Sequence, residues 1–151
     1  MRIVAGTARG RKLSVPSNSE IRPTKDRVRE AIFNSLHSYG LVEDLRYLDL
    51  FAGTGSLGLE ALSRGANSVV FVDNNALSIE TITHNLQMLG FDSKAEVRHQ
   101  DAVMYLKEIR DFDVAILDPP YEFNLWDQLL SQIKSKVVVI ETSQKIIPNE
   151  S

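Results

Sequence analysis

Short apolar runs alternate with helical patterns along the chain from Leu41 onward. Five of these runs are predicted to be strands: Tyr47–Phe51, Ser68–Val72, Ala95–His99, Phe112–Leu117 and Val137–Ile140. Helices are predicted over residues 56–64, 76–89, 102–110 and 124–133. Nearly continuous apolar strands separated by helices are typical of a parallel sheet that is buried on both faces. The chain is therefore predicted to have an α/β, Rossmann-like fold, with a mostly parallel sheet flanked by helices.

The segment before the first strand is polar and rich in turn-forming residues. A helix is predicted there from Thr24, a candidate N-cap, because Val28, Ile32 and Leu36 recur at helical spacing. This part of the chain is expected to form a basic N-terminal extension and helix that belongs to one compact unit with the rest.

Charge is distributed unevenly along the chain. The whole sequence has 17 Lys and Arg against 20 Asp and Glu, a net charge of −3, which by itself argues against a nucleic-acid-binding protein. Residues 1–30, however, hold eight basic and three acidic side chains, a net charge of +5, whereas the other 121 residues hold nine and seventeen, a net charge of −8. This asymmetry indicates either that the basic end meets a polyanion or that it is a solvated arm beside an acidic domain.

The composition excludes several kinds of site. The chain has no cysteine, so disulfides, thiolate zinc sites and cysteine nucleophiles are excluded. Its three histidines are scattered without metal-ligand spacing, and no metal is expected. No apolar run approaches the roughly 20 residues of a membrane helix, and the first apolar stretch is too short for a signal peptide. A cytoplasmic protein without a membrane partner is therefore expected.

A glycine-rich turn follows the first predicted strand. Gly53, Gly55 and Gly58 form a G-x-G-x-x-G frame between that strand and a helix, the setting in which such a frame binds a nucleoside cofactor. Glycines let the backbone turn sharply and approach a ligand closely. Asp73, at the end of the second strand, can accept hydrogen bonds from both hydroxyls of a ribose. Nicotinamide dinucleotides and S-adenosylmethionine both fit this pattern.

Asp49, two residues before Phe51, favours one of these cofactors. A negative side chain near the helix N-terminus would repel a pyrophosphate. The ammonium and sulfonium groups of S-adenosylmethionine would instead be attracted. The pattern leans toward S-adenosylmethionine, although Asp49 could also be a strand-end acid that caps a turn.

Asp118, Pro119, Pro120 and Tyr121 follow the fourth predicted strand, where ligands bind in open α/β sheets. Consecutive prolines delete two N–H donors, so the Asp118 carboxylate and the Pro119 carbonyl keep their capacity to accept hydrogen bonds from a planar –NH₂ group. Tyr121 can stack on a nucleobase, which would have to be exposed or flipped. If both amine hydrogens are accepted, the nitrogen can pyramidalise and direct its lone pair at a methyl group for in-line transfer.

With both motifs on strand ends, the chain resembles the class I S-adenosylmethionine-dependent methyltransferases that act on an amino nitrogen. Longer and more specific matches lie in Gly10–Leu13, Arg22–Thr24, Asp26–Glu30, Phe33–Asn34 and residues 49–66. On these segments the chain is similar, over nearly its whole length, to the bacterial family that methylates guanine N2 in 16S ribosomal RNA. The resemblance implies S-adenosylmethionine as cofactor and ribosomal RNA or the small ribosomal subunit as partner. It implies two parts of the chain. Residues 1–46 would form an RNA-facing extension that is also part of the cofactor lid, and residues 47–151 would form the catalytic, cofactor-binding domain.

The resemblance also implies roles for individual residues. The cofactor would be bound by Arg22, Thr24, Asp49, Phe51, Ala52, Gly53, Thr54, Gly55, Gly58, Asp73, Asn74, Asp101 and Ala102. The catalytic residues at the target base would be Asp118, Pro119, Pro120 and Tyr121. RNA phosphates would be met by Arg9, Arg11, Lys12, Arg27 and Arg29. Arg27 and Arg29 could equally pair with Asp26 or Glu30 on the helix surface.

Members of this family usually continue past the fifth strand into two more strands, whereas this chain stops at Ser151. The last two strands are therefore expected to be missing, and the protein to be a monomer that could associate through an exposed sheet edge. Three alternatives stay open: an amino-methyltransferase on adenine N6 of RNA or DNA, a nicotinamide-dependent oxidoreductase, and a non-catalytic nucleoside-binding module.

Overall fold

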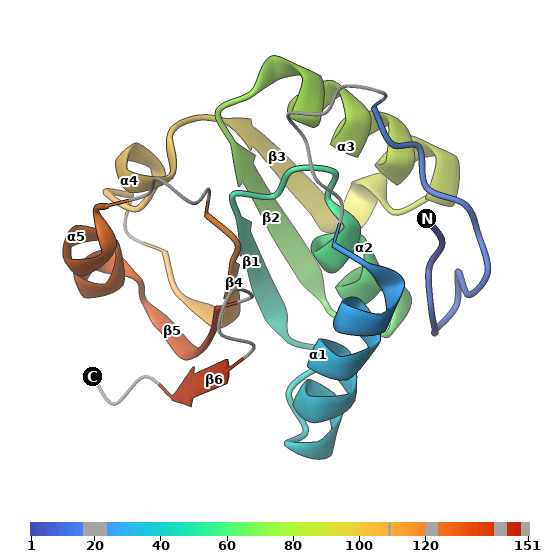
Figure 1. The fold of residues 1–151 in the computed structure, drawn as a ribbon, viewed down its shortest axis with the longest axis horizontal. Coiled ribbons are helices and arrows are strands. Elements are labelled where there is room, and N and C mark those ends of the chain that lie inside the picture. Colours follow the sequence, from blue (N-terminus) through green and yellow to red (C-terminus); the bar gives the residue numbers. More distant parts are fainter. Residues whose placement is uncertain (17–23, 109, 120–123, 141–144, 149–151) are drawn as a thin grey trace.

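A computed structural model of the chain describes residues 1–16, 24–108, 110–119, 124–140 and 145–148. Within these residues six strands form one sheet in the order β3-β2-β1-β4-β5-β6 (Figure 1). The strands are β1 Arg46–Leu50, β2 Ser68–Asp73, β3 Ala95–His99, β4 Phe112–Leu117, β5 Ser135–Ile140 and β6 Lys145–Pro148. The first five run parallel and β6 runs antiparallel to β5. The predicted Rossmann-like α/β architecture is confirmed.

Helices cover both faces of this sheet. The helices are α1 Asp26–Ser38, α2 Ser56–Ser63, α3 Ala76–Leu89, α4 Ala102–Tyr105 and α5 Trp126–Gln132, with a short 3₁₀ turn η1 at Asp92–Lys94. Figure 1 shows α1, α2 and α3 on one side and α4 and α5 on the other. Because strand side chains alternate between faces, Val69 and Phe71 of β2 pack in the core beneath α1–α3, whereas Val70 and Val72 pack beneath α4 and α5. One sheet is thus packed between two hydrophobic cores.

Two predicted helix boundaries differ from the structure. The helix expected over residues 102–110 ends at Tyr105, after which the Lys107 and Glu108 amides bond three residues back, to Met104 and Tyr105, in a tighter turn. Thr24 does not cap α1; the helix begins after Lys25, and no side chain caps it. Helix-forming residues continue beyond the observed ends of both helices, but tertiary packing decides where the helical hydrogen bonds stop.

The expectation that both strands beyond the fifth are missing is wrong. Residues Lys145–Pro148 pair with β5 in an antiparallel ladder that sets Ile140 opposite Lys145 and Val137 opposite Pro148. The run is short and ends in a proline, so its apolar pattern is too brief to predict a strand. Pairing satisfies backbone groups of β5 that would otherwise form the sheet edge.

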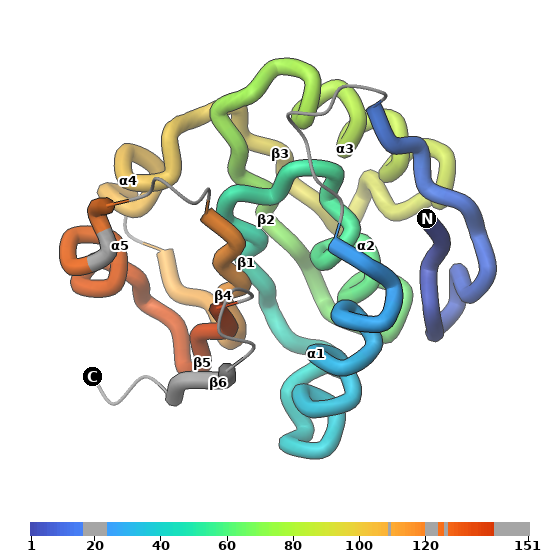
Figure 2. Tube along the Cα trace, viewed as in Figure 1, coloured from blue at the N-terminus to red at the C-terminus, as the bar shows by residue number. Residues whose placement is uncertain are grey.

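The N-terminal segment, residues 1–16, packs against the same core as the helices. An antiparallel bridge joins Arg2 to Lys12, and the Leu13 amide donates to the Met1 carbonyl at 3.0 Å. Ile3 and Leu13 are buried in the core beneath α1–α3. Figure 2 shows this segment running alongside α2 and α3. In the part of the chain that the structure describes, no helix is long and apolar enough to cross a membrane.

Candidate active site

The carboxyl ends of β1, β2 and β4 meet at one edge of the sheet. Leu50 pairs with Val72 on one side and with Leu117 on the other, so the residues that come next, Phe51, Asp73 and Asp118, follow at the same level. The structure therefore brings together the two motifs that the sequence predicted separately. Open α/β sheets bind their ligands at this edge.

The glycine turn after β1 has a strained backbone that is held in place by hydrogen bonds. Phe51 has a φ of 60°, in the left-handed region that a non-glycine residue rarely adopts, and Gly53 and Gly55 have φ values of 59° and 79°. The Gly53 amide donates to Asp73 Oδ2 at 2.9 Å, and the Ala52 amide donates to the Val72 carbonyl at 3.0 Å. A strained non-glycine residue is typical of a site that positions a ligand, with a cost of about 1–3 kcal/mol.

Gly58 lets α2 approach the sheet. A Cβ atom at this position would lie 2.3 Å from Cε1 of Phe71 and 3.0 Å from Oδ2 of Asp49. Because that space is left open, the Gly58 amide reaches Asp49 Oδ2 at 3.0 Å. The third glycine of the frame therefore serves packing and the orientation of Asp49, while the first two shape the turn.

Asp49 is a buried carboxylate beneath this turn, with only 2% of its surface exposed. Burial raises its pKa well above the ordinary value, the hydrogen bond from Gly58 opposes that rise, and the charges of Asp118 and Asp73 add to it. Asp118 and Asp73 are thus near enough to Asp49 for their charges to repel its own. A cationic ligand at this edge would relieve both the burial of charge and the repulsion.

Asp73 is oriented by backbone groups on both of its oxygens. Oδ2 accepts from Gly53, and Oδ1 accepts from the Asn75 amide at 2.9 Å. Each oxygen keeps a lone pair for a ligand hydroxyl. Asn74, which the sequence predicted beside the adenine, is exposed next to it. Asp73 and Asn74 thus lie beside the glycine turn, at the carboxyl end of β2.

Asn75 supports this part of the site, although the sequence motifs did not single it out. Its side-chain oxygen accepts the amides of Leu77 and Ser78 and so caps α3. An asparagine directly before a helical pattern is a recognisable cap signal. The cap holds the first turn of α3 beside Asp73.

Asp101 and Ala102 reach the same edge from β3. The Gln100 amide donates to the Asp73 carbonyl at 2.9 Å, which joins the end of β3 to the end of β2. Asp101 is exposed and caps α4 by accepting the Met104 amide at 3.1 Å, while Ala102 is buried.

Of the motif that follows β4, the structure describes the first two residues. Asp118 is half-buried and Pro119 is buried directly after β4. Pro120, Tyr121, Arg22 and Pro23 lie outside the described residues. Thr24, predicted to bind the cofactor, is buried at the start of the segment that leads into α1, with 8% exposure.

Arg29 is not an RNA-facing residue, and that expectation is corrected. Its side chain is fully buried; Nη2 contacts Asp26 Oδ1 at 2.6 Å and donates to the Arg2 carbonyl, and Nε lies 3.4 Å from Glu60 Oε1. Burial lowers the pKa of Arg29, and the charges of Glu60 and Asp26 oppose that effect. Position 29 shares the buried face of α1 with Ile32, Phe33 and Leu36. That helical spacing was the signal in the sequence that could have revealed its burial.

Glu60 is the centre of this buried cluster. Its side chain has 0% exposure; it forms an ion pair with Arg29 and accepts a hydrogen bond from Arg64 Nε at 2.8 Å. Its two oxygens also accept the amides of Val4 and Ala5, at 2.9 and 3.0 Å. One carboxylate of α2 therefore binds α1 and the N-terminal segment together.

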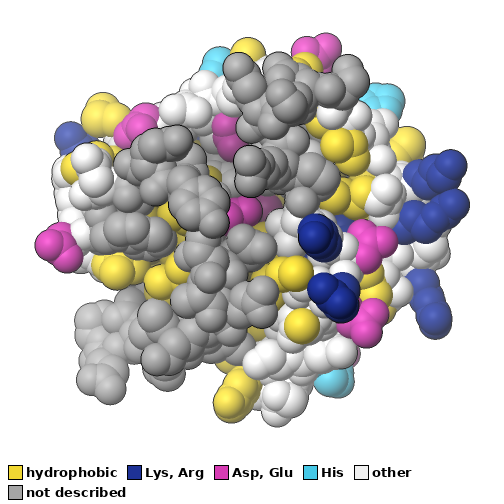
Figure 3. Space-filling model, viewed as in Figure 1, with side chains coloured by type: hydrophobic (Ala, Val, Ile, Leu, Met, Phe, Trp, Pro, Cys, Tyr) yellow, Lys and Arg dark blue, Asp and Glu magenta, His cyan; other side chains and the backbone are white. Residues whose placement is uncertain are grey.

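The other predicted RNA-facing residues lie on the surface. Arg9, Arg11, Lys12 and Arg27 are exposed, and Arg11 Nη2 donates to the Met88 carbonyl of α3 at 2.9 Å. Figure 3 shows Lys and Arg side chains gathered on the side of the molecule formed by the N-terminal segment and α1. This placement keeps four of the five predicted residues available to a polyanion.

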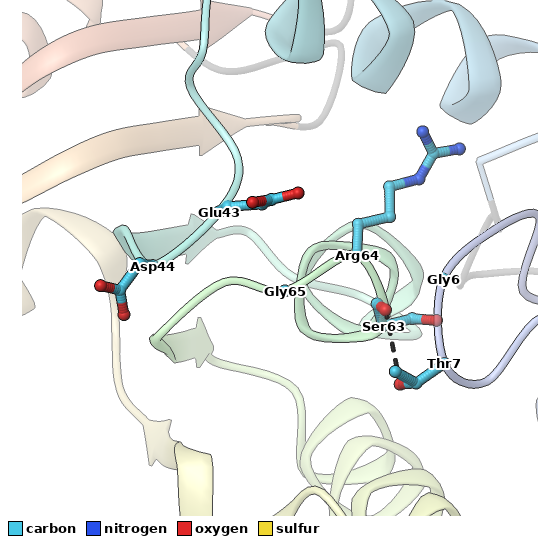
Figure 4. Close-up of a pocket in the computed structure, with 7 residues that line it drawn as sticks. All are labelled: Gly6, Thr7, Glu43, Asp44, Ser63, Arg64 and Gly65. Carbon is cyan, nitrogen blue, oxygen red and sulfur yellow. Dashed lines mark hydrogen bonds between the residues drawn. The ribbon is translucent and has the colours of Figure 1, made fainter.

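A hollow of about 560 Å³ lies at the opposite edge of the sheet (Figure 4). It is lined by Gly6, Thr7, Glu43, Asp44, Ser63, Arg64 and Gly65. Glu43 and Asp44 precede β1, and Ser63, Arg64 and Gly65 lie at the end of α2, before β2. The hollow is therefore remote from the carboxyl ends of the strands that carry the acids. The described residues also contain no cluster of His, Asp or Glu that could hold a metal ion.

Comparison with known proteins gives consistent matches. The family model described as Conserved hypothetical protein 95 matches residues 1–151. The chain is 45% identical over 135 residues to "Ribosomal RNA small subunit methyltransferase D" of Haemophilus influenzae, covering 87% of this chain and 69% of the relative. It is 36% identical over 135 residues to the protein of the same name in Escherichia coli, covering 89% and 67%. The solved structure "Putative methyltransferase yhhF from Escherichia coli" is similar with a TM-score of 0.79 and 32% identity, over 93% of this chain and 77% of that chain. The fold is thus that of Rossmann-like methyltransferases.

Proposed function

Since the chain belongs to the family described as Conserved hypothetical protein 95, we propose that it transfers a methyl group from S-adenosylmethionine to the N2 amine of a guanine in 16S ribosomal RNA. Its relatives are named ribosomal RNA small subunit methyltransferases, and the chain is accordingly an rRNA methyltransferase. Guanine N2 as the target atom is our proposal. The observation that carries the cofactor assignment is the buried Asp49, with Asp73 and Asp118 beside it at the glycine turn.

The described residues fit S-adenosylmethionine better than a nicotinamide dinucleotide. Asp49 would attract the ammonium of its methionine part, and the two oriented oxygens of Asp73 would accept the ribose hydroxyls. A pyrophosphate at the same turn would meet three carboxylates and be repelled. When bound, S-adenosylmethionine supplies an electrophilic methyl group on a sulfonium.

The target amine would be held by the exit of β4. Asp118 and the Pro119 carbonyl would each accept one N–H of the amine, which orients the nitrogen lone pair toward the methyl carbon. Methyl transfer would form the N–C bond and break the S–C bond, and the nitrogen would then lose one proton, for which the Asp118 carboxylate would be an acceptor. Positioning and electrostatics, rather than covalent catalysis, supply the rate enhancement in this scheme.

Radiolabelled methyl transfer tests the proposed function directly. The protein is incubated with labelled S-adenosylmethionine and with either naked 16S rRNA or small ribosomal subunits, and the RNA is digested to nucleosides. We expect label in N2-methylguanosine. Label in N6-methyladenosine, label in DNA only, or no label in either RNA substrate would contradict the proposal and favour one of the alternatives.

RNA phosphates would be met by exposed cations of the N-terminal segment and α1. Within the described part of the chain, no hydrogen bond or ion pair joins the side chains of Arg9, Lys12, Lys25 or Arg27 to another residue, so their charges are not neutralised by the fold. Such charges give RNA affinity that falls steeply with salt. Lys25 was not singled out from the sequence, although it precedes α1 directly.

The double variant Arg9→Ala/Lys12→Ala is expected to weaken RNA binding and to make it less sensitive to salt. The slope of log K against log salt concentration should fall by about 1 for each phosphate that the variant no longer binds. Fluorescence anisotropy with an rRNA fragment over a salt series measures it. The matched control, Arg98→Ala/Arg110→Ala, removes the same charge from a surface cluster paired with Glu96, at 2.7 and 2.8 Å. Equal slopes for the two double variants would contradict the assignment.

Replacing Asp49 by asparagine is expected to weaken S-adenosylmethionine binding while stabilising the fold. Loss of a charged partner for the ammonium should raise the dissociation constant about 10- to 100-fold. Because its folded pKa is raised, wild-type Asp49 contributes stability that is fully present below its unfolded pKa and is lost as pH rises through the folded pKa. The stabilisation by asparagine should therefore grow as pH rises above about 4.

Titration calorimetry and urea unfolding between about pH 4 and pH 9 would measure both effects. Asp113→Asn is the control of opposite sign. Burial raises the pKa of Asp113, but the Arg46 amide and the Lys136 and Arg46 charges outweigh that effect and lower it overall. The stability that Asp113 contributes is present above its unfolded pKa and is lost as pH falls through its folded pKa. Asp113→Asn should therefore destabilise the protein at neutral pH. If Asp49→Asn were as destabilising as Asp113→Asn, the burial argument would be wrong.

A further inference from the structure

The backbone of the N-terminal segment is held by side chains of α2 and α3, and α2 holds its first part. Glu60 of α2 accepts the amides of Val4 and Ala5, and Ser63 Oγ accepts the Ala8 amide at 2.9 Å. These backbone N–H groups, which a neighbouring strand would satisfy in a sheet, are thus satisfied by side chains of a helix. The segment is therefore a built part of the fold and not a loose basic tail.

Asn85 of α3 holds the far end of this segment. Its side chain has 0% exposure, its Oδ1 accepts the Ser14 amide at 2.8 Å, and its Nδ2 donates to the Ser14 carbonyl at 3.0 Å. The paired strand-like bonding of the segment ends at Leu13, whose amide donates to Met1. The Asn85 amide continues that bonding by one residue, since it offers the same donor and acceptor as a peptide group.

This contact fixes cations relative to the candidate cofactor site. Ser14 lies two residues after Lys12, and Arg11 donates to the Met88 carbonyl of the same helix α3. Helix α3 itself begins at the Asn75 cap beside Asp73. Asn85 is ten residues along α3 from that cap, roughly 15 Å at the rise of an α-helix. The cations at Arg11 and Lys12 are thus held at a set distance from the ribose-binding carboxylate.

We propose that Asn85 is a positioning residue for the RNA substrate. By fixing Ser14 against α3, it sets the position at which the N-terminal cations meet RNA phosphates relative to the target base. This inference rests on the proposed function, because it assumes that the substrate is RNA. Asn85 is fully buried, so it would act on the substrate through the backbone of Ser14.

The test removes the contact from each side. Ser14→Pro deletes the N–H that donates to Asn85 without altering the buried helix face, while Ser14→Ala keeps the N–H and is the matched control, because Ser14 is exposed. Asn85→Ala removes the contact from the helix side. Steady-state methylation of small ribosomal subunits gives KM for the RNA substrate and kcat, calorimetry gives the S-adenosylmethionine dissociation constant, and thermal unfolding gives Tm.

We expect Ser14→Pro and Asn85→Ala to raise KM for the RNA substrate about tenfold, with kcat and the S-adenosylmethionine dissociation constant changed less than about twofold. Ser14→Ala should match the wild type. An unchanged RNA KM in Ser14→Pro would overturn the inference, and so would an equal loss of affinity for RNA and cofactor, because that is what a merely structural residue would cause. If Asn85→Ala does not fold, Ser14→Pro decides. Failure of the wild-type protein to methylate any RNA would instead refute the proposed function.

Discussion

Replacing Asp118 by alanine is expected to lower kcat for RNA methylation about 10²- to 10³-fold, with the S-adenosylmethionine dissociation constant changed less than about threefold. Asp118 follows β4 at the level of Phe51 and Asp73, at the edge of the sheet where the target amine is proposed to bind. An acceptor that orients the amine and takes up positive charge as the N–C bond forms stabilises the transition state more than the ground state. The loss should therefore fall on kcat and not on cofactor binding.

Single-turnover methyl transfer with saturating cofactor measures this effect. Asp118→Asn separates two contributions, because the amide keeps one acceptor oxygen but loses the charge, and its rate should lie between those of alanine and the wild type. Asp111→Asn is the control: Asp111 is an exposed acid that precedes the opposite end of the same strand. A wild-type kcat in Asp118→Ala would exclude the proposed role of the β4 exit, whatever the RNA specificity.

Replacing Glu60 by alanine is expected to lower the free energy of unfolding by about 3–5 kcal/mol, as for other buried ion pairs that lose one partner. The change would leave Arg29 and Arg64 without their shared carboxylate, and Arg29 is fully buried. It would also leave the amides of Val4 and Ala5 without acceptors. Each buried group that loses its partner adds a desolvation cost.

Urea unfolding followed by circular dichroism measures this loss. Glu60→Gln should cost less than Glu60→Ala, because the amide oxygen can still accept one backbone N–H. Glu80→Ala, an exposed glutamate on α3, should change stability by less than about 0.5 kcal/mol. A loss below about 1 kcal/mol in Glu60→Ala would show that the cluster does not hold the N-terminal segment to α2.

Much of the fold could be predicted from local patterns. The first five strands follow from short apolar runs, whose periodicity depends only on neighbouring residues. The proximity of the glycine turn and Asp73 could also be predicted. Asp73 comes twenty residues after Gly53, and the strand–turn–helix order brings both to one edge of the sheet. Strand β6 could not be predicted in this way, because Lys145–Pro148 is stabilised as a strand by the ladder with β5 and not by its own pattern.

The sequence by itself determined the order of strands and helices, and with it the edge of the sheet at which the acids Asp49, Asp73 and Asp118 meet. Only the tertiary structure decided which charges remain available. Arg29 and Arg9 contribute equally to the positive charge of the first thirty residues, yet Arg29 is buried against Glu60, thirty-one positions away, and Arg9 stays exposed. Charge is a property of the residue, whereas its neutralisation depends on partners that only folding brings within a few ångströms.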